Sequence, residues 1–248
     1  MKTATIRRIR EQSETLLNAR TMAVGLVVAG LAMLTAPRSQ AAIVEVDNVG
    51  ATTGAFDPFT LNNDLVNAGQ PTLLSPVSQT GGTPLAGTAA GLNDGSTATS
   101  PWTTMEWLPA AVMTTTFQLN TSLPTATGGY TITGVNSIMG WLTVPPWGWQ
   151  DYDLQVATRD NPTFTTIYSV AYRPAGQAGT MVQLTSSTGV LATGVTAIQF
   201  VQDAAVSGQS IPHEFDVLGF GTVPEPSTVL LCGLGGLLIR RRLGSRRA

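Results

Sequence analysis

Apolar and polar residues alternate along much of this chain with a period of two, which is typical of half-buried β-strands. The runs that predict strands are Ile43–Val49, Met113–Leu119, Tyr130–Thr133, Tyr152–Val156, Phe164–Tyr172, Met181–Leu184, Val195–Val201 and Glu214–Phe220. Turn residues separate these runs, and no amphipathic helical pattern competes with them. The pattern therefore predicts an all-β fold, an antiparallel β-sandwich or jelly roll.

Two stretches add local detail to this pattern. Gly134 breaks the alternation before Val135, which predicts a β-bulge. Residues 50–99 are rich in Gly, Pro, Asn, Ser and Thr and show little periodicity. We expect long loops there, with one short strand near Thr72–Leu74.

The first 41 residues have the pattern of an export signal. Five basic residues lie among the first 20 and are followed by the apolar run Thr21–Ala36. Small residues at Ser39 and Ala41 fit cleavage before Ala42. We predict a signal-peptide helix over residues 1–41, with an uncleaved N-terminal anchor as the alternative.

The last 26 residues combine a stiff hinge, an apolar segment and a basic end. Val223, Pro224, Glu225 and Pro226 form the hinge, since proline fixes φ and lacks an N–H. Residues 228–239 carry no charge and three arginines follow at 240–242. As a helix this segment would be about 20 Å long, shorter than the ~30 Å hydrocarbon core of a bilayer. We expect a short membrane helix with its arginines in the cytoplasm.

This order of features resembles the PEP-CTERM sorting signal of Gram-negative bacteria. The resemblance implies processing at Val223–Pro226 by an exosortase, a membrane transpeptidase-like protease, and a link to extracellular polysaccharide. The chain would then be anchored transiently in the inner membrane and finally reside at the cell surface or in the extracellular matrix. An ordinary C-terminal anchor is the alternative. The expected domains are a signal peptide at 1–41, a β-sandwich at 42–222 and a sorting signal at 223–248.

Charge and cysteine content narrow the function further. Charged residues make up 11% of the chain, and residues 42–222 contain twelve acids but only two bases, Arg159 and Arg173. A body with a net charge of about −10 has no basic surface for phosphates, so we expect no nucleic-acid partner. The only cysteine, Cys232, lies in the apolar tail, so neither an intramolecular disulfide nor a cysteine zinc site is expected.

A second resemblance covers roughly residues 85–220. It is carried by Gly91–Gly95, Tyr130–Trp141, Gln150–Val156, Tyr172–Pro174, Gly194–Phe200 and Glu214–Gly219, in this order. These segments are similar to the galactose-binding-like, discoidin-type jelly roll. The chain departs from many discoidin domains because its body lacks the disulfide that closes their ends.

The resemblance also implies a structural calcium site. In that family the loop that corresponds to Asn93–Thr97 often joins a glutamate of the last strand around the ion. Matched position by position, Asp94 and Glu214 are the candidate ligands, and Ca²⁺ prefers such oxygen donors. The alternative is that Asp94–Gly95 is only a turn.

The tryptophans offer candidate ligand contacts. Trp147 and Trp149 lie in the loop 145–150, and in extended backbone they would share one face. Flat rings stack on sugar C–H faces while polar groups bind hydroxyls. The candidate sugar-binding residues are Trp147, Trp149, Gln150, Asp151 and Arg159. The alternative is that these rings close one end of the sandwich.

No residue pattern predicts catalysis. His213 is the only histidine, no Gly-x-Ser-x-Gly motif accompanies it, and we expect it where a strand begins. Carboxylate pairs for glycoside hydrolysis could be drawn from Glu106, Asp151, Asp153 or Asp160, but nothing in the spacing selects one pair. We therefore expect a carbohydrate-binding or adhesion module that is not an enzyme. The alternatives are a purely structural matrix protein and, least favoured, a polysaccharide hydrolase.

Overall fold

The computed structural model describes residues 42–50, 56, 64–81, 83–86, 89–97, 105–107, 112–140, 148–175, 179–202 and 211–224, and of 83–86 and 105–107 only the backbone. The chain divides into two units, Met1–Gln40 and Ala41–Ala248, and all described residues belong to the second. The predicted signal peptide and most of the predicted sorting signal lie outside the described residues. Within the described ranges no helix is both long and apolar enough to cross a membrane.

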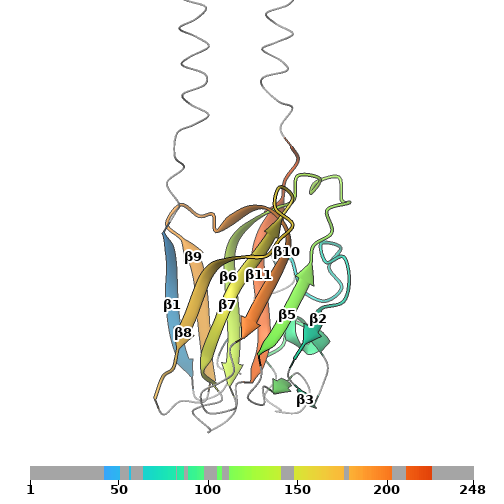
Figure 1. Ribbon diagram of the computed structural model, residues 1–248. Helices are drawn as coiled ribbons and strands as arrows, with labels where there is room; N and C mark the ends of the chain where they lie inside the picture. Colours follow the sequence, from blue (N-terminus) through green and yellow to red (C-terminus); the bar gives the residue numbers. More distant parts are fainter. Residues whose placement is uncertain are drawn as a thin grey trace, which may run out of the picture. The chain divides into compact units, whose positions relative to one another are not determined.

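One layer of the body consists of four antiparallel strands (Figure 1). Their order is β1 (Ile43–Gly50), β9 (Gly179–Ser186), β6 (Tyr130–Gly140) and β11 (Pro212–Gly221). Inner-face residues lie in register across this layer, since Val135 is opposite both Leu184 and Val217. All three are fully buried, so this face of the layer contributes to the core.

The second layer consists of five antiparallel strands. Their order is β8 (Thr165–Tyr172), β7 (Gln150–Thr158), β10 (Ala192–Gln202), β5 (Met113–Gln118) and β2 (Ser78–Thr80). The start of β10 also pairs with β6 through Ala192 and Val195, which joins the two layers. A small two-stranded sheet, β3 (Thr83–Ala86) with β4 (Met105–Trp107), and the 3₁₀ turn η2 (Ala89–Leu92) complete the described elements.

Aromatic side chains from both layers meet between the sheets. Phe200 of β10 stacks on Phe215 of β11 with ring centroids 4.1 Å apart, and Phe117 of β5 meets both rings edge-on. Tyr152 of β7 lies 5.5 Å from Phe200. All four rings are at most 2% exposed, so they pack the two sheets face to face. The predicted all-β antiparallel sandwich is confirmed.

The predicted bulge at Gly134 is also confirmed. The register between β6 and β11 shifts where Leu218 is opposite Gly134 but Gly219 is opposite Ile132. The extra residue turns both Ile132 and Val135 into the core, where each is 1% exposed.

The loop prediction for residues 50–99 was partly wrong. The short strand lies at β2 rather than at Thr72–Leu74, where Leu73 makes only a single bridge to Leu119. The stretch also contains β3 and η2. Three-residue strands such as β2 are too short to show a period in the sequence, and pairing with β5 defines this one.

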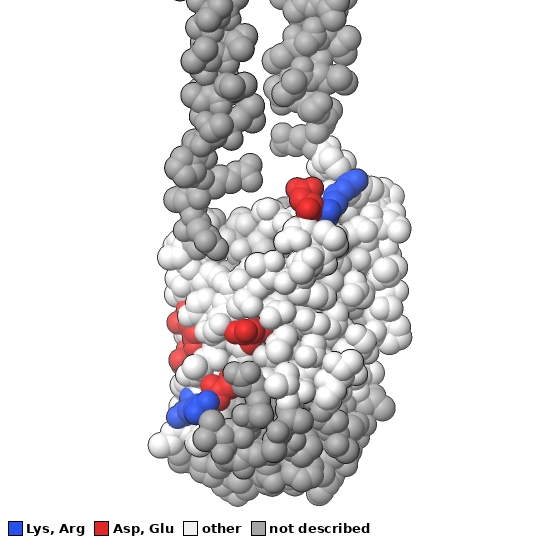
Figure 2. All heavy atoms as spheres, viewed as in Figure 1, with Lys and Arg blue, Asp and Glu red and all other residues white. Residues whose placement is uncertain are grey.

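Charged side chains are sparse on the described surface. Figure 2 shows them as a few separate spots on one face, without a broad basic area among the described residues drawn there. Each of the two arginines of the body lies next to acidic residues in the chain or in space: Arg159 precedes Asp160, and Arg173 pairs with Asp151.

Candidate functional site

The last strand, β11, carries two acidic side chains on the outer face of its layer. Glu214 and Asp216 alternate with Phe215 and Val217, which point into the core. The register confirms this, because Glu214 is opposite Ile138 while Phe215 is opposite the inner-face residue Ser137. Both carboxylates are nevertheless 0% exposed, so other segments must cover them.

One covering segment is the turn that follows η2. Gly95 has a φ of 77°, a conformation that favours glycine, and its N–H donates to Oε1 of Glu214 at 3.0 Å. A Cβ at Gly95 would lie 2.9 Å from the amide nitrogen of Asn67. The predicted partners, the Asp94 turn and Glu214, therefore do lie together. Asp94 itself is exposed, and its Oδ1 accepts a hydrogen bond from the Ser96 N–H at 2.9 Å.

The second covering segment, residues 64–70, was not predicted to belong to the site. Asp64 pairs with Leu218 beyond the edge of β11 and is 2% exposed. Its Oδ1 accepts hydrogen bonds from the N–H groups of Val217 at 2.8 Å and Val66 at 3.1 Å. Asp64 lies in a stretch without periodicity, so the sequence contains no signal that links it to β11.

Asp64, Glu214 and Asp216 form a buried carboxylate cluster. Each offers an oxygen that lies within 4.8 Å of the others. Burial raises the pKa of Glu214 to about 10, and the charges of Asp216, Asp94 and Asp64 add to this rise. Burial likewise raises the pKa of Asp64 to about 7, although its backbone hydrogen bonds oppose the shift. Three buried carboxyl groups this close cannot all ionise without a compensating cation.

The donor set of this cluster fits a hard divalent cation. Oδ2 of Asp64 and Oε2 of Glu214 are buried without a hydrogen-bond partner among the described residues. Such carboxylate oxygens are what Ca²⁺ selects, and backbone carbonyls supply the remaining ligands in most sites. The cation would neutralise the cluster and fix the Gly95 turn and residues 64–70 against β11.

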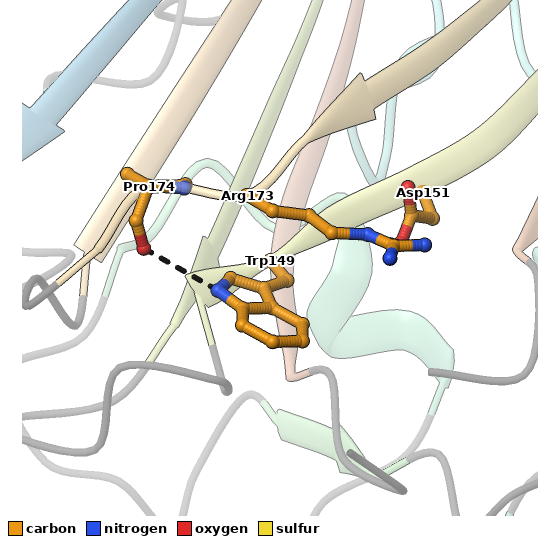
Figure 3. Close-up of polar contacts among 4 residues, drawn as sticks. All are labelled: Trp149, Asp151, Arg173 and Pro174. Atoms are coloured by element: carbon orange, nitrogen blue, oxygen red, sulfur yellow. Dashed lines mark hydrogen bonds and ion pairs between the residues drawn. The ribbon is translucent and has the colours of Figure 1, made fainter. Parts of the chain in front are cut away.

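A second candidate site lies where β7 begins and β8 ends (Figure 3). The Arg173 guanidinium forms an ion pair with Oδ2 of Asp151 at 2.5 Å and lies 5.7 Å from the centre of the Trp149 ring. The indole N–H of Trp149 donates to the Pro174 carbonyl at 3.3 Å. Asp151 and Trp149 are half-buried and Arg173 is exposed. This aromatic corner combines a ring with charged hydrogen-bonding groups at the surface.

Two residues that were predicted to belong to this site do not lie at the aromatic corner. Gln150 was wrongly predicted as a ligand contact. It is 0% exposed, and its side-chain amide donates to the Ser137 carbonyl and to the Thr180 hydroxyl. Arg159 was also wrongly placed, because it follows the opposite end of β7, about 30 Å of extended chain from Gln150. There it donates to the Thr127 carbonyl. Trp147 lies outside the described residues.

Two of the remaining chemical candidates, His213 and Asp153, have hydrogen-bond partners within the body. His213 lies at the start of β11, as predicted, and its Nε2 is 2.7 Å from the Gly140 carbonyl oxygen. Burial lowers the pKa of His213 to about 4, which keeps the ring neutral. Oδ1 of Asp153 accepts the Ser169 hydroxyl at 2.5 Å.

An uncharged groove of about 390 Å³ is formed by residues of the segments 68–77 and 90–93. It is lined by Ala68–Gln70, Leu73–Val77, Ala90 and Asn93. Two of its walls are joined by a hydrogen bond from the Ala68 N–H to the Asn93 carbonyl at 2.6 Å. The same two segments reach the cluster through Asp64 and Gly95, so the groove and the cluster share their support.

Comparisons with known proteins find likeness at the level of structure only. No known protein family and no curated protein matches the sequence. One similar structure is a family 32 carbohydrate-binding module of Clostridium perfringens, solved with GalNAc-β-1,3-galactose. Its sequence is 17% identical, and the match covers 57% of this chain and 93% of the module at a TM-score of 0.41. A Streptococcus pneumoniae fucose-binding module is 13% identical, with 64% and 98% covered and a TM-score of 0.41. Likeness this distant does not assign a function.

Proposed function

We propose that this chain is an exported carbohydrate-binding module that acts in adhesion to extracellular polysaccharide, without catalytic activity. The observation that carries the proposal is the aromatic corner, where Trp149, Asp151 and Arg173 lie together at the surface. An indole ring beside a carboxylate and a guanidinium can stack on the apolar face of a sugar while charged groups bind its hydroxyls.

The binding experiment compares the full-length chain in detergent with its Trp149→Ala and Arg173→Ala variants. The probes are galactose and fucose, the sugars named for the similar solved modules, together with the exopolysaccharide of the native host. Both variants should lose binding but keep their melting temperature. The control is Asp160→Ala, which removes an exposed carboxyl remote from the corner. Unchanged binding in both variants would leave the corner as a structural end of the sandwich.

We also propose that the carboxylate cluster binds calcium as a structural ion. Glu214 would bind it through Oε2, while Gly95 holds the other oxygen in place. The Asp94 carboxylate, predicted as a ligand, lies close enough to raise the pKa of Glu214 and would contribute charge to the site. The ion would stabilise the fold and take no part in a reaction.

Processing by an exosortase is the part of the proposal that concerns the termini. It is supported by the sequence at Val223–Pro226 and the apolar segment that follows. The body ends at Gly221, the last residue of β11, directly before this hinge. Intact-mass measurement on protein secreted by the native host should give a product without residues 1–41 and without the arginine tail. A mature extracellular form that retains residues 240–248 would contradict sorting.

Two alternatives would lead to other results. A purely structural matrix protein would bind none of the probes, and its Trp149→Ala variant would lose stability instead. A hydrolase would release reducing sugars from the polysaccharide. The three-carboxylate cluster of Asp64, Glu214 and Asp216 is buried, which favours ion binding over attack on a polymer at this place.

A further inference from the structure

The hydrogen bonds of Asp64 do not require a carboxyl group. One of its oxygens, Oδ1, accepts both backbone N–H groups, from Val66 and Val217. The side-chain carbonyl of an asparagine would accept the same two bonds without burying a charge. The second oxygen, Oδ2, has no hydrogen-bond partner among the described residues and is buried. Burying this second oxygen costs free energy, and the hydrogen bonds that Oδ1 accepts from the backbone do not explain why a carboxyl group is present.

The position of Asp64 gives that explanation. Its carboxylate belongs to the same 4.8 Å cluster as Glu214 and Asp216, yet it lies about 150 residues before them in the chain. Asp64 begins the segment whose next residue, Leu65, donates its N–H to the Val217 carbonyl at 2.8 Å. A cation bound by both Asp64 and Glu214 would add a second link between this segment and the last strand, besides these backbone hydrogen bonds.

We infer that Asp64 is a ligand of the cation and that the bound ion ties residues 64–70 to β11. This inference rests on the proposed calcium site and adds a residue to it. With Asp64, the ligands come from two segments that are distant in the chain. Glu214 and Asp216 alone would bind the ion on a single strand. The ion then also fixes the groove wall that begins at Ala68.

The first test is calcium titration of the full-length chain in detergent, followed by isothermal calorimetry. Asp64→Asn keeps both N–H acceptor bonds and removes only the charge. The dissociation constant for calcium should rise about tenfold or more, because ligand charge sets calcium affinity. Asp160→Asn, a matched change at an exposed carboxyl, should leave it unchanged. Equal affinity of wild type and Asp64→Asn would overturn the inference, whereas absence of calcium binding in the wild type would overturn the calcium site itself.

The second test compares melting temperatures in calcium and in EDTA. In EDTA, Asp64→Asn should melt higher than the wild type, because one of three crowded carboxyls is gone; in calcium it should melt lower. A variant that melts lower in both conditions would show that Asp64 serves only the backbone.

A third measurement needs no variant. Calcium should slow hydrogen exchange at the Leu65 and Val66 amides of the wild type. Unchanged exchange at these amides in a chain that binds calcium would overturn the inference.

Discussion

The two edge strands of the four-stranded layer, β1 and β11, share the same sequence pattern, Glu-apolar-Asp. In β1 the pattern is Glu45–Asp47, and in β11 it is Glu214–Asp216. The acids of β11 lie on the outer face and are fully buried, while the residue between them, Phe215, points into the core. In β1 the orientation is reversed, and Val46 is 45% exposed.

Pairing and cover produce this difference. Glu45 is opposite Leu184 and Asp47 is opposite Val182, both core residues of β9, so the acids of β1 point toward the second layer. They lie at its rim, where Glu45 is near enough to the Tyr168 hydroxyl of β8 to raise the pKa of that hydroxyl. Figure 1 shows β1 and β8 on the same side of the sandwich. A period of two thus tells which residues share a face, but not which face is covered.

The largest effect should come from exchanging the residue in the middle of each pattern. Phe215→Ala removes a ring from the stacked core and should lower the free energy of unfolding by about 3–5 kcal/mol. Val46→Ala should change it by less than about 0.5 kcal/mol, since Val46 faces solvent. Urea denaturation measures both. Similar losses in the two variants would contradict the opposite orientation of the two strands.

Calcium removal should give the next largest effect, and only at β11. A ligand that binds the native state alone adds about 2.7 kcal/mol at a concentration 100 times its dissociation constant. EDTA should therefore lower the melting temperature of the wild type. Glu214→Gln should abolish this difference, and Glu45→Gln should preserve it. A difference that persists in Glu214→Gln would place the ion elsewhere.

A smaller effect is expected at the rim of β1. Tyr168→Phe deletes the hydroxyl whose pKa Glu45 raises. Because the pair is partly exposed, the loss in unfolding free energy should stay below about 1 kcal/mol. The Tyr152 hydroxyl, 2.9 Å from the Ser137 hydroxyl in the core, offers a matched comparison. Tyr152→Phe should cost more than Tyr168→Phe, because it leaves a buried polar partner. The reverse order in urea denaturation would contradict the exposed position of the β1 acids.

The strands of the body could be predicted from the sequence because each long strand has one face in the core. The alternation located β5, β6, β7, β9, β10 and β11, and the broken parity at Gly134 located the bulge. The alternation could not predict which face of β1 points toward the second layer. Its acids and valines alternate equally well in either orientation, and only pairing with β9 decides between them.

The candidate sites were predictable to a lesser extent, since they depend on contacts between distant segments. Asp94 and Glu214 were matched through a family resemblance, and the structure does bring their segments together. Asp64 reaches the cluster through a single bridge to β11, which leaves no pattern in the sequence. Gln150 was misplaced because its amide is satisfied by Ser137 and Thr180 from two other strands, and polar residues otherwise indicate surface.

The smallest effect concerns the pH dependence of the β1 pair. Desolvation raises the pKa of Asp47 to about 6, and the neighbouring Glu45 charge adds to the rise. Tyr168 and Tyr172 of β8 and Tyr152 of β7 face the pair, and none of them brings a positive charge. The folded chain therefore holds the Asp47 proton more tightly than the unfolded chain does. This stabilisation is complete below pH 3.8 and is lost as the pH rises through about 6.

The measurement compares the unfolding free energy of the wild type and Asp47→Asn between pH 4 and pH 7, in saturating calcium so that the β11 cluster stays neutralised. As the pH rises through this window, the wild type should lose stability relative to the variant, because only the wild type has a carboxyl to ionise at this position. The change should be small, since Asp47 is exposed and solvent screens its charge. Asp160→Asn serves as the control for a general effect of removing one acid. A difference in unfolding free energy between wild type and Asp47→Asn that stays constant across the window would mean that the β1 acids are solvated independently of each other. The contrast between β1 and β11 would then rest on burial alone.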